Sequence, residues 1–83
     1  FIKDYRSLPS DIQHAVAECI EDFERDPLPE SRRPHSVTPK GQRPIIYTMD
    51  VTSNKSHKLS FDVQGESVIL RRVGTHKQID RTP

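Results

Sequence analysis

One apolar stripe at helical spacing constrains this chain more than any other feature. The stripe follows an i, i+3, i+4, i+7, i+8, i+11 pattern and consists of Ile12, Ala15, Val16, Cys19, Ile20 and Phe23. Such a stripe predicts an amphipathic helix that buries one face, and Pro9 suits the beginning of this helix because the first turn has no use for the missing amide hydrogen. Cys19 is the single cysteine, so we expect it to pack in the core rather than form a disulfide.

The partner of this helix is predicted to be a sheet. Phe1, Tyr5 and Leu8 predict a short helix before Pro9, and three β-branched or alternating runs follow at residues 45–51, 58–63 and 68–73. The sequence therefore predicts an α+β fold in which two N-terminal helices pack on an antiparallel β-sheet meander.

The chain is expected to form one domain. Its 83 residues divide by composition into a helical half (residues 1–26), a basic loop rich in Pro, Ser, Arg and Lys (residues 27–44), and a strand meander (residues 45–83). The loop is not expected to contain regular structure. No apolar run is long enough to span a bilayer and no signal-peptide pattern is present, so we expect a cytoplasmic protein with no membrane contact.

The net charge of +1 hides an asymmetry. Residues 1–31 carry three basic against eight acidic side chains, a net charge of −5, whereas residues 32–83 carry ten basic against four acidic, a net charge of +6. A basic half is typical of a protein that binds a phosphate-rich partner, and it is equally compatible with a solvated face that balances the acidic half.

Basic residues and histidines gather in the strand half. Lys55, His57 and Lys58 precede or open one predicted strand, and the next one closes on Arg71 and Arg72 before Gly74 and His76. Because the start of one antiparallel strand lies beside the end of its partner, we expect these groups to meet at one end of the sheet. Gly74 is expected to form a turn that exposes His76 on the rim.

These residue types suit RNA cleavage. Attack of a 2′-hydroxyl on the adjacent phosphorus needs a base, an acid and cations to stabilise the phosphorane. His76 is a candidate acid or base because histidine as a residue type titrates near neutral pH, while Arg72 and Lys58 are candidate phosphate ligands. No metal or cofactor is expected, because the four histidines have no metal-ligand spacing. Both His57 and His76 are also compatible with ordinary surface positions. If Arg71 and Arg72 alternate in direction, one of them is free to pair with the acidic helix while the other reaches substrate.

The order of elements, from KDYRSLPSDIQ through a basic loop to RRVGTHKQID, resembles the RelE/ParE superfamily of bacterial toxins from toxin–antitoxin pairs, and its ending is most similar to the YafQ-like branch. In that family a strand precedes the first helix, so the first strand is expected to be missing here. The resemblance implies an endoribonuclease that cuts messenger RNA on the ribosome without a metal, blocks translation and is silenced by a cognate antitoxin protein.

Carried over by position, the resemblance implies catalytic roles for His76, Arg72 and Lys58, with His57 as a weaker candidate. RelE-type members have two lysines near the positions of Met49 and Val51. The basic residues expected to contact RNA by charge are Arg32, Arg33, Lys40, Arg43, Lys55, Arg71 and Lys77. Two alternatives stay open, a ParE-like inhibitor of DNA gyrase and a non-catalytic module that binds RNA or a protein partner.

Overall fold

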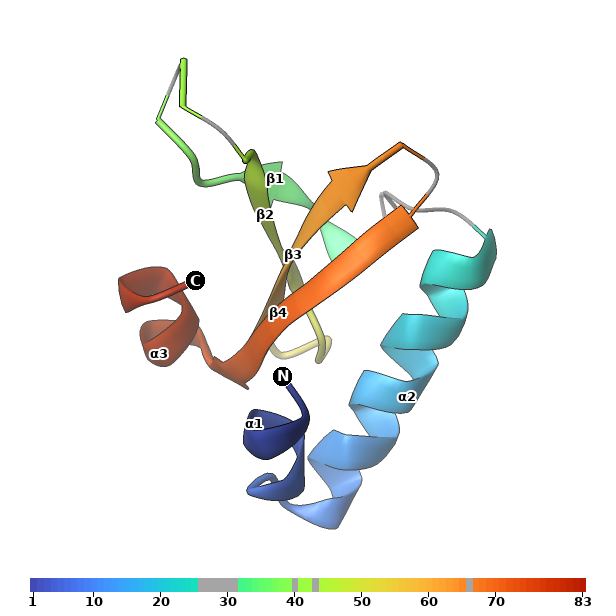
Figure 1. The fold of residues 1–83 in the computed structure, drawn as a ribbon. Helices are drawn as coiled ribbons and strands as arrows, with labels where there is room; N and C mark the ends of the chain where they lie inside the picture. Colours follow the sequence, from blue (N-terminus) through green and yellow to red (C-terminus); the bar gives the residue numbers. More distant parts are fainter. Residues whose placement is uncertain (26–31, 40, 43, 66) are drawn as a thin grey trace.

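The computed structural model describes residues 1–25, 32–39, 41–42, 44–65 and 67–83. Its elements follow in the order α1 (Ile2–Arg6), α2 (Ser10–Arg25), β1 (His35–Ser36), β2 (Ile46–Asp50), β3 (His57–Gln64), β4 (Ser67–Thr75) and α3 (His76–Arg81). The strands form one antiparallel sheet in the order β1-β2-β3-β4. The α+β class and the antiparallel meander predicted from the sequence are therefore confirmed (Figure 1).

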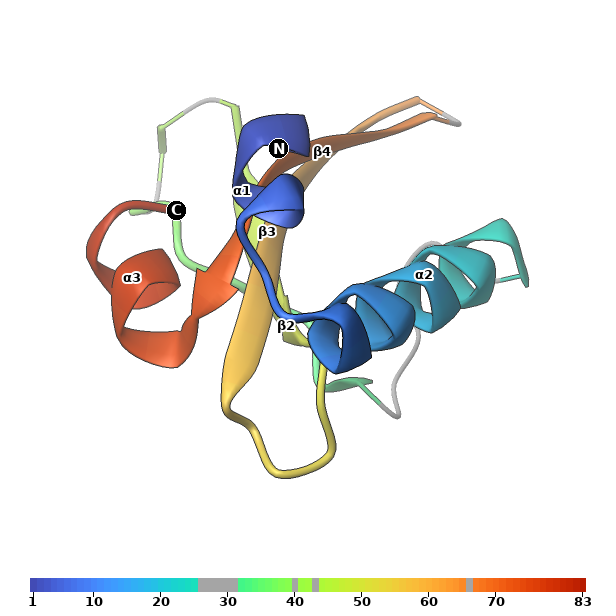
Figure 2. The same ribbon diagram turned by 90° about the horizontal axis from the view of Figure 1, so that it is seen from below.

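The helices lie on two sides of the sheet. Both views place α2 on one side of the strands and α3 on the other, with α1 next to β4 (Figures 1 and 2). Pro9 immediately precedes α2, and its carbonyl oxygen accepts a hydrogen bond from the Gln13 amide at 3.0 Å. None of the helices in the described ranges is long and apolar enough to cross a membrane.

The apolar stripe of α2 packs on one face of the sheet. The fully or almost fully buried members of this core are Val16, Cys19, Met49, Val51, Leu59, Phe61 and Val73. Tyr47 of β2 stacks on Phe61, its partner in β3, with ring centroids 5.5 Å apart. Burial raises the pKa of the Cys19 thiol to about 12, as expected for a cysteine that serves as a core residue. The side chain of Phe23 lies outside the described part of the stripe.

The opposite face of the sheet is polar and faces α3. Thr48, Lys58, Ser60 and Asp62 are buried, and strand alternation puts Lys58, Ser60 and Asp62 on the side away from Leu59 and Phe61. The Ser60 hydroxyl donates to the Pro83 carbonyl oxygen at 3.2 Å, which ties the C-terminal segment to this face. A sheet with one apolar and one polar buried face results.

A β-bulge in β4 decides where its two arginines go. Ser60 pairs with Arg72 and the next residue, Phe61, pairs with Leu70, so Arg71 is an extra residue opposite the partner strand. The bulge keeps both Leu70 and Val73 against the core, although three positions separate them. Consequently the expectation of simple alternation between Arg71 and Arg72 is wrong.

The structure corrects the expectations for the basic loop and for the end of the last strand. The basic loop contains β1, whose His35 and Ser36 pair with Thr48 and Tyr47, so the described sheet has four strands rather than three. The last strand runs on to Thr75 instead of ending near Val73, and His76 begins the helix α3. Lys40 and Arg43 of the same loop lie outside the described residues.

Candidate functional site

The site is built where β3 begins and β4 ends. His57 pairs with Thr75 and Lys58 with Gly74, and the His76 amide donates to the Ser56 carbonyl oxygen at 3.0 Å. The antiparallel register thus brings Lys58, His57 and His76 to the same end of the sheet, as the sequence predicted.

The centre of the site is a cluster of Lys58, His76 and Asp80, called here the Asp80 cluster. His76 Nε2 lies 2.7 Å from Asp80 Oδ2, and Lys58 Nζ lies 3.2 Å from Asp80 Oδ1. A carboxylate only accepts hydrogen bonds, so Nε2 carries the proton in this pair. Nδ1 of His76 has no hydrogen bond in the described part of the chain.

Exposure separates the roles within the Asp80 cluster. The His76 and Asp80 side chains are 48% and 44% exposed, whereas that of Lys58 is only 7% exposed. The His76 side chain is therefore accessible from solvent, while Lys58 is an internal partner that balances the charge of Asp80. Lys58 was expected to contact phosphate, but its side chain is buried and its Nζ atom is paired with Asp80.

The helix that carries His76 is fixed by its own first residues. Thr75 and Gln78 form a capping box, in which the Gln78 amide donates to the Thr75 hydroxyl and the Thr75 amide donates to Gln78 Oε1. Ile79 anchors the helix by complete burial. These contacts hold His76 and Asp80 one helical turn apart, at the i, i+4 spacing that allows them to pair.

Gly74 lies close to the Gln78 side chain and does not form a turn. It lies within β4 and is not among the residues with positive φ. A Cβ atom at this position would lie 2.6 Å from Gln78 Oε1, far inside van der Waals contact. The predicted glycine turn is thus wrong, and in this structure the capping side chain of Gln78 occupies the space beside Gly74.

Arg72 lies on the same side of the sheet and is held by α1. Its Nε and Nη2 atoms lie 3.2 Å and 3.3 Å from the two carboxylate oxygens of Asp4, and Nη1 donates to the Thr82 carbonyl oxygen at 3.1 Å. The bond from Arg72, against a smaller opposing effect of burial, lowers the pKa of the Asp4 carboxyl, and the Val73 amide acts in the same direction. Arginine has five N–H donors, so two remain, one on each Nη atom, and the side chain is 37% exposed.

His57 is not part of the Asp80 cluster. Its neighbour in sequence, Lys58, faces Asp80, so alternation directs the His57 side chain to the other face of β3. There its Nδ1 lies 2.7 Å from the Ser56 hydroxyl, which in turn lies 3.1 Å from the Thr52 hydroxyl. The backbones of His57 and His76 are adjacent, but the His57 side chain contacts Ser56 whereas the His76 side chain contacts Asp80.

Arg32 is a structural residue. Its Nε lies 2.6 Å from Asp22 Oδ2, its Nη1 donates to the Val51 carbonyl oxygen at 2.9 Å, and the side chain is 18% exposed. The hydrogen bond from Arg32, with that from Arg25, lowers the pKa of Asp22. The acidic face of α2 therefore does pair with an arginine, and this arginine comes from the loop instead of from β4.

Arg33 and Lys55 line a separate cavity of about 560 Å³ between α2 and the connection from β2 to β3. Both have left-handed backbone conformations, with φ of 54° and 64°. The cavity is also lined by Glu18, Asp22 and Asp50, and Arg33 Nε lies 3.7 Å from an Asp50 oxygen. This mixture of charges is not that of a simple anion site.

The remaining expected RNA contacts lie apart from one another. Arg71 pairs loosely with the buried Asp62, with Nη1 and Oδ2 3.9 Å apart, and Lys77 is exposed on α3. Met49 and Val51, near whose positions RelE-type members have two lysines, are buried in the apolar core of this chain. No group of three or more His, Cys, Asp or Glu residues suited to a metal ion occurs in the ranges that the structure describes.

Two site residues were missed in the sequence. Asp80 escaped notice because its pairing with His76 depends on α3, and the capping pattern from Thr75 to Gln78 was the signal for that helix. Asp4 pairs with Arg72 across 68 positions of sequence, and no local pattern indicates such a contact.

The fold is similar to that of a solved chain. In the structure of a RelB–RelE antitoxin–toxin complex from Methanococcus jannaschii, one chain superimposes with a TM-score of 0.66 and 24% sequence identity, covering 100% of this chain and 93% of that chain. No protein-family model matches the sequence, and no curated protein matches it. The structural similarity shows a fold found in a toxin–antitoxin complex.

Proposed function

We propose that this chain is the toxin component of a toxin–antitoxin pair and that it acts as an endoribonuclease on ribosome-bound messenger RNA. The fold shared with a chain of an antitoxin–toxin complex supports the first part. The observation that carries the second part is the pairing of His76 Nε2 with Asp80, which leaves Nδ1 unbonded on a half-exposed imidazole.

The chemistry follows from this arrangement. The 2′ oxygen of the substrate bonds to phosphorus and the bond from phosphorus to the 5′ oxygen breaks, which yields a cyclic phosphate and a 5′-hydroxyl. One proton leaves the 2′-hydroxyl and one reaches the 5′ oxygen; His76 serves one of these transfers through Nδ1 and water serves the other. Asp80 orients the imidazole through Nε2, and Lys58 acts only through Asp80.

Arg72 supplies the positive charge for the reacting phosphate. Its two remaining N–H groups, one on each Nη atom, offer the forked geometry that suits phosphate oxygens. Asp4 and the Thr82 carbonyl oxygen fix this fork in advance, so little order has to be gained on binding. An antitoxin is the proposed protein partner, and blocked translation is the proposed consequence of messenger cleavage.

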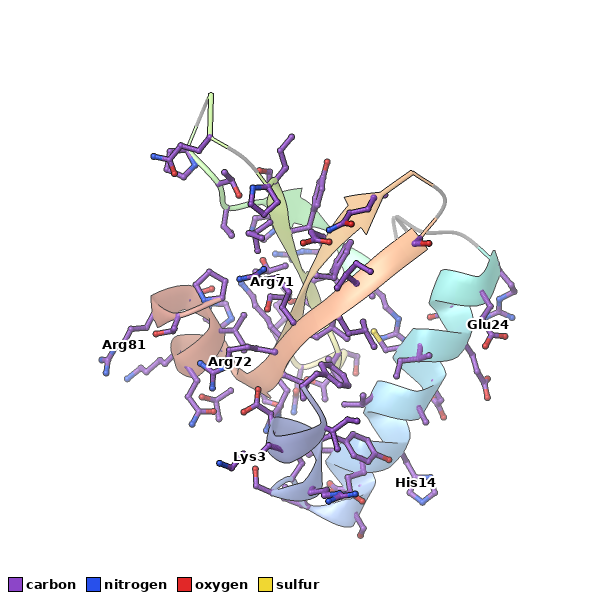
Figure 3. All side chains as sticks on the ribbon, in the orientation of Figure 1. Lys3, His14, Glu24, Arg71, Arg72 and Arg81 are labelled. Atoms are coloured by element: carbon purple, nitrogen blue, oxygen red, sulfur yellow. The ribbon has the colours of Figure 1, made fainter. Side chains whose placement is uncertain are left out.

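The test is the mapping of new 5′ ends in cellular messenger RNA by primer extension after brief expression in a bacterial host. Wild type is compared with His76→Ala and with His14→Ala, a matched control because His14 is an exposed histidine on the outer side of α2 (Figure 3). Cuts within translated codons are expected for wild type and His14→Ala and are expected to vanish for His76→Ala. Intact messages with continued growth arrest would contradict the proposal.

A non-catalytic module that binds RNA or a protein is the second candidate. It is favoured by the fact that both cations of the site, Lys58 and Arg72, are already paired with carboxylates. In that case His76→Ala leaves growth arrest unchanged and no new 5′ ends form. A ParE-like inhibitor gives the same RNA result together with broken DNA.

A further inference from the structure

A small cavity beside the site is lined by cations without a carboxylate. It has a volume of about 330 Å³ and lies between the end of β4 and the outer part of α3, with Arg72, Lys77, Gln78, Arg81 and Thr82 around it. The larger cavity near Arg33 contains three carboxylates, so the two differ in the charge of ligand that they suit.

The charges of this cavity are unbalanced on α3. Lys77 and Arg81 are exposed, form no ion pair within the described ranges, and stand four positions apart on a helix of six residues. Like charges at i, i+4 destabilise a helix, and an anion between them would remove this repulsion. Figure 3 shows Arg72 and Arg81 on the side of the molecule that carries α3.

The polar groups of the cavity are held in place as donors. Arg72 is fixed by Asp4 and by the Thr82 carbonyl oxygen. Gln78 accepts the Thr75 amide through Oε1, so its Nε2 hydrogens are left to donate. The ammonium group of Lys77 and the guanidinium group of Arg81 add further donors. Together, these donors match an anion that accepts several hydrogen bonds at once.

We propose that Lys77 and Arg81, in the cavity next to Arg72, form a binding pocket for a phosphate group. Resting on the proposed function for the identity of the ligand, this phosphate belongs to the backbone of the RNA strand and is distinct from the reacting phosphate that Arg72 contacts. The pocket then positions the strand, whereas His76 and Asp80 perform the proton transfer.

The test measures binding to a single-stranded 2′-O-methyl oligonucleotide, which resists cleavage, so that its result does not depend on catalysis. The double variant Lys77→Ala/Arg81→Ala is compared with wild type and with Lys3→Ala/Arg6→Ala. The control removes two exposed positive charges from α1 and thus leaves the same net charge. All four side chains are exposed, so both variants are expected to fold.

We expect the affinity of Lys77→Ala/Arg81→Ala to fall by about tenfold or more at moderate salt. The slope of log K against log salt is expected to decrease by about 0.7, the value for one lost phosphate contact to a single strand. The control is expected to keep the slope of wild type. An unchanged slope in Lys77→Ala/Arg81→Ala, or an equal change in the control, would overturn the proposal.

Inorganic phosphate serves as a second probe. Titration into the ¹⁵N-labelled protein is expected to shift the amide signals of Lys77, Gln78 and Thr82 in wild type and not in the double variant. If inorganic phosphate shifts these signals but the double variant binds the oligonucleotide as tightly as wild type, the pocket binds phosphate from a small molecule and the assignment to an RNA strand is wrong. If phosphate causes no shifts and oligonucleotide binding is also unchanged in the double variant, the pocket itself is refuted. A lack of cleavage by wild type on ribosomes would refute the proposed nuclease without changing these results.

Discussion

Gly74 and Gln78 are coupled by a close contact. Replacing Gly74 with Ala puts a Cβ atom 2.6 Å from Gln78 Oε1, which breaks the capping box of α3. We expect Gly74→Ala to lower the free energy of unfolding by about 1–2 kcal/mol, the usual cost of losing a cap. In Gly74→Ala/Gln78→Ala the clash is absent, so the double variant should be no less stable than Gln78→Ala. Urea unfolding of the four proteins measures this coupling, and strictly additive effects would contradict it.

Asp4 makes the stability of the protein depend on pH in the acid range. Because Arg72 lowers the pKa of Asp4 below its usual value of 3.8, the folded state prefers the ionised carboxylate. The stabilisation is fully present above the unfolded pKa and is lost as the pH falls through the lower, folded pKa. We therefore expect wild type to exceed Asp4→Asn in stability at neutral pH, with a difference that shrinks below about pH 4. Urea midpoints at a series of pH values test this, and a difference independent of pH would count against the ion pair.

Ile79 anchors α3, the element that presents both His76 and Asp80. Complete burial of this side chain leads us to expect that Ile79→Ala destabilises the protein by about 2–4 kcal/mol. Ile2→Ala is the matched control, because Ile2 is 66% exposed and should change the free energy of unfolding by less than about 0.5 kcal/mol. Thermal or urea unfolding compares the two. Equal effects would mean that α3 is not held by its apolar contact.

The elements differ in how far they follow from the sequence. The stripe from Ile12 to Ile20 predicted α2 because one face of that helix, including Val16 and Cys19, packs into the core. The short strand β1 has no periodicity of its own and exists because His35 and Ser36 pair with β2, which no local pattern reveals. The helix α3 was missed, although Thr75 and Gln78 carry a capping signal, because its six residues bury only Ile79.

The candidate site, too, could be predicted only where it depends on strand pairing and not on tertiary contacts. Antiparallel pairing predicted that Lys58 and His76 meet, since register depends only on the hairpin. The burial of Lys58 was not predictable, because it results from α3 covering the polar face. The broken alternation from Leu70 to Val73 was a visible sign of the bulge that directs Arg72 toward Asp4.

At the scale of the whole molecule, the residues that stabilise the fold and those proposed to act on RNA lie on opposite faces of the sheet. Its apolar face packs against α2 and contains the core, while its polar face, covered by α3, contains Lys58, Ser60 and Asp62. Substitutions on the exposed rim of the polar face, at His76 for example, are therefore expected to change activity with little change in stability. This separation makes the central claim, that His76 and Asp80 cleave RNA, open to a direct measurement.

That measurement is cleavage of a defined messenger RNA on purified ribosomes, with either ribose or 2′-deoxyribose at the nucleotide that precedes the cut. Wild type is expected to cut the first messenger and not the second, since the 2′-hydroxyl is the nucleophile. His76→Ala is expected to cut neither, while the control His14→Ala behaves as wild type. Cleavage of the deoxy messenger, or undiminished cleavage by His76→Ala, would contradict the role assigned to the site, and no cleavage by wild type would contradict the proposed nuclease.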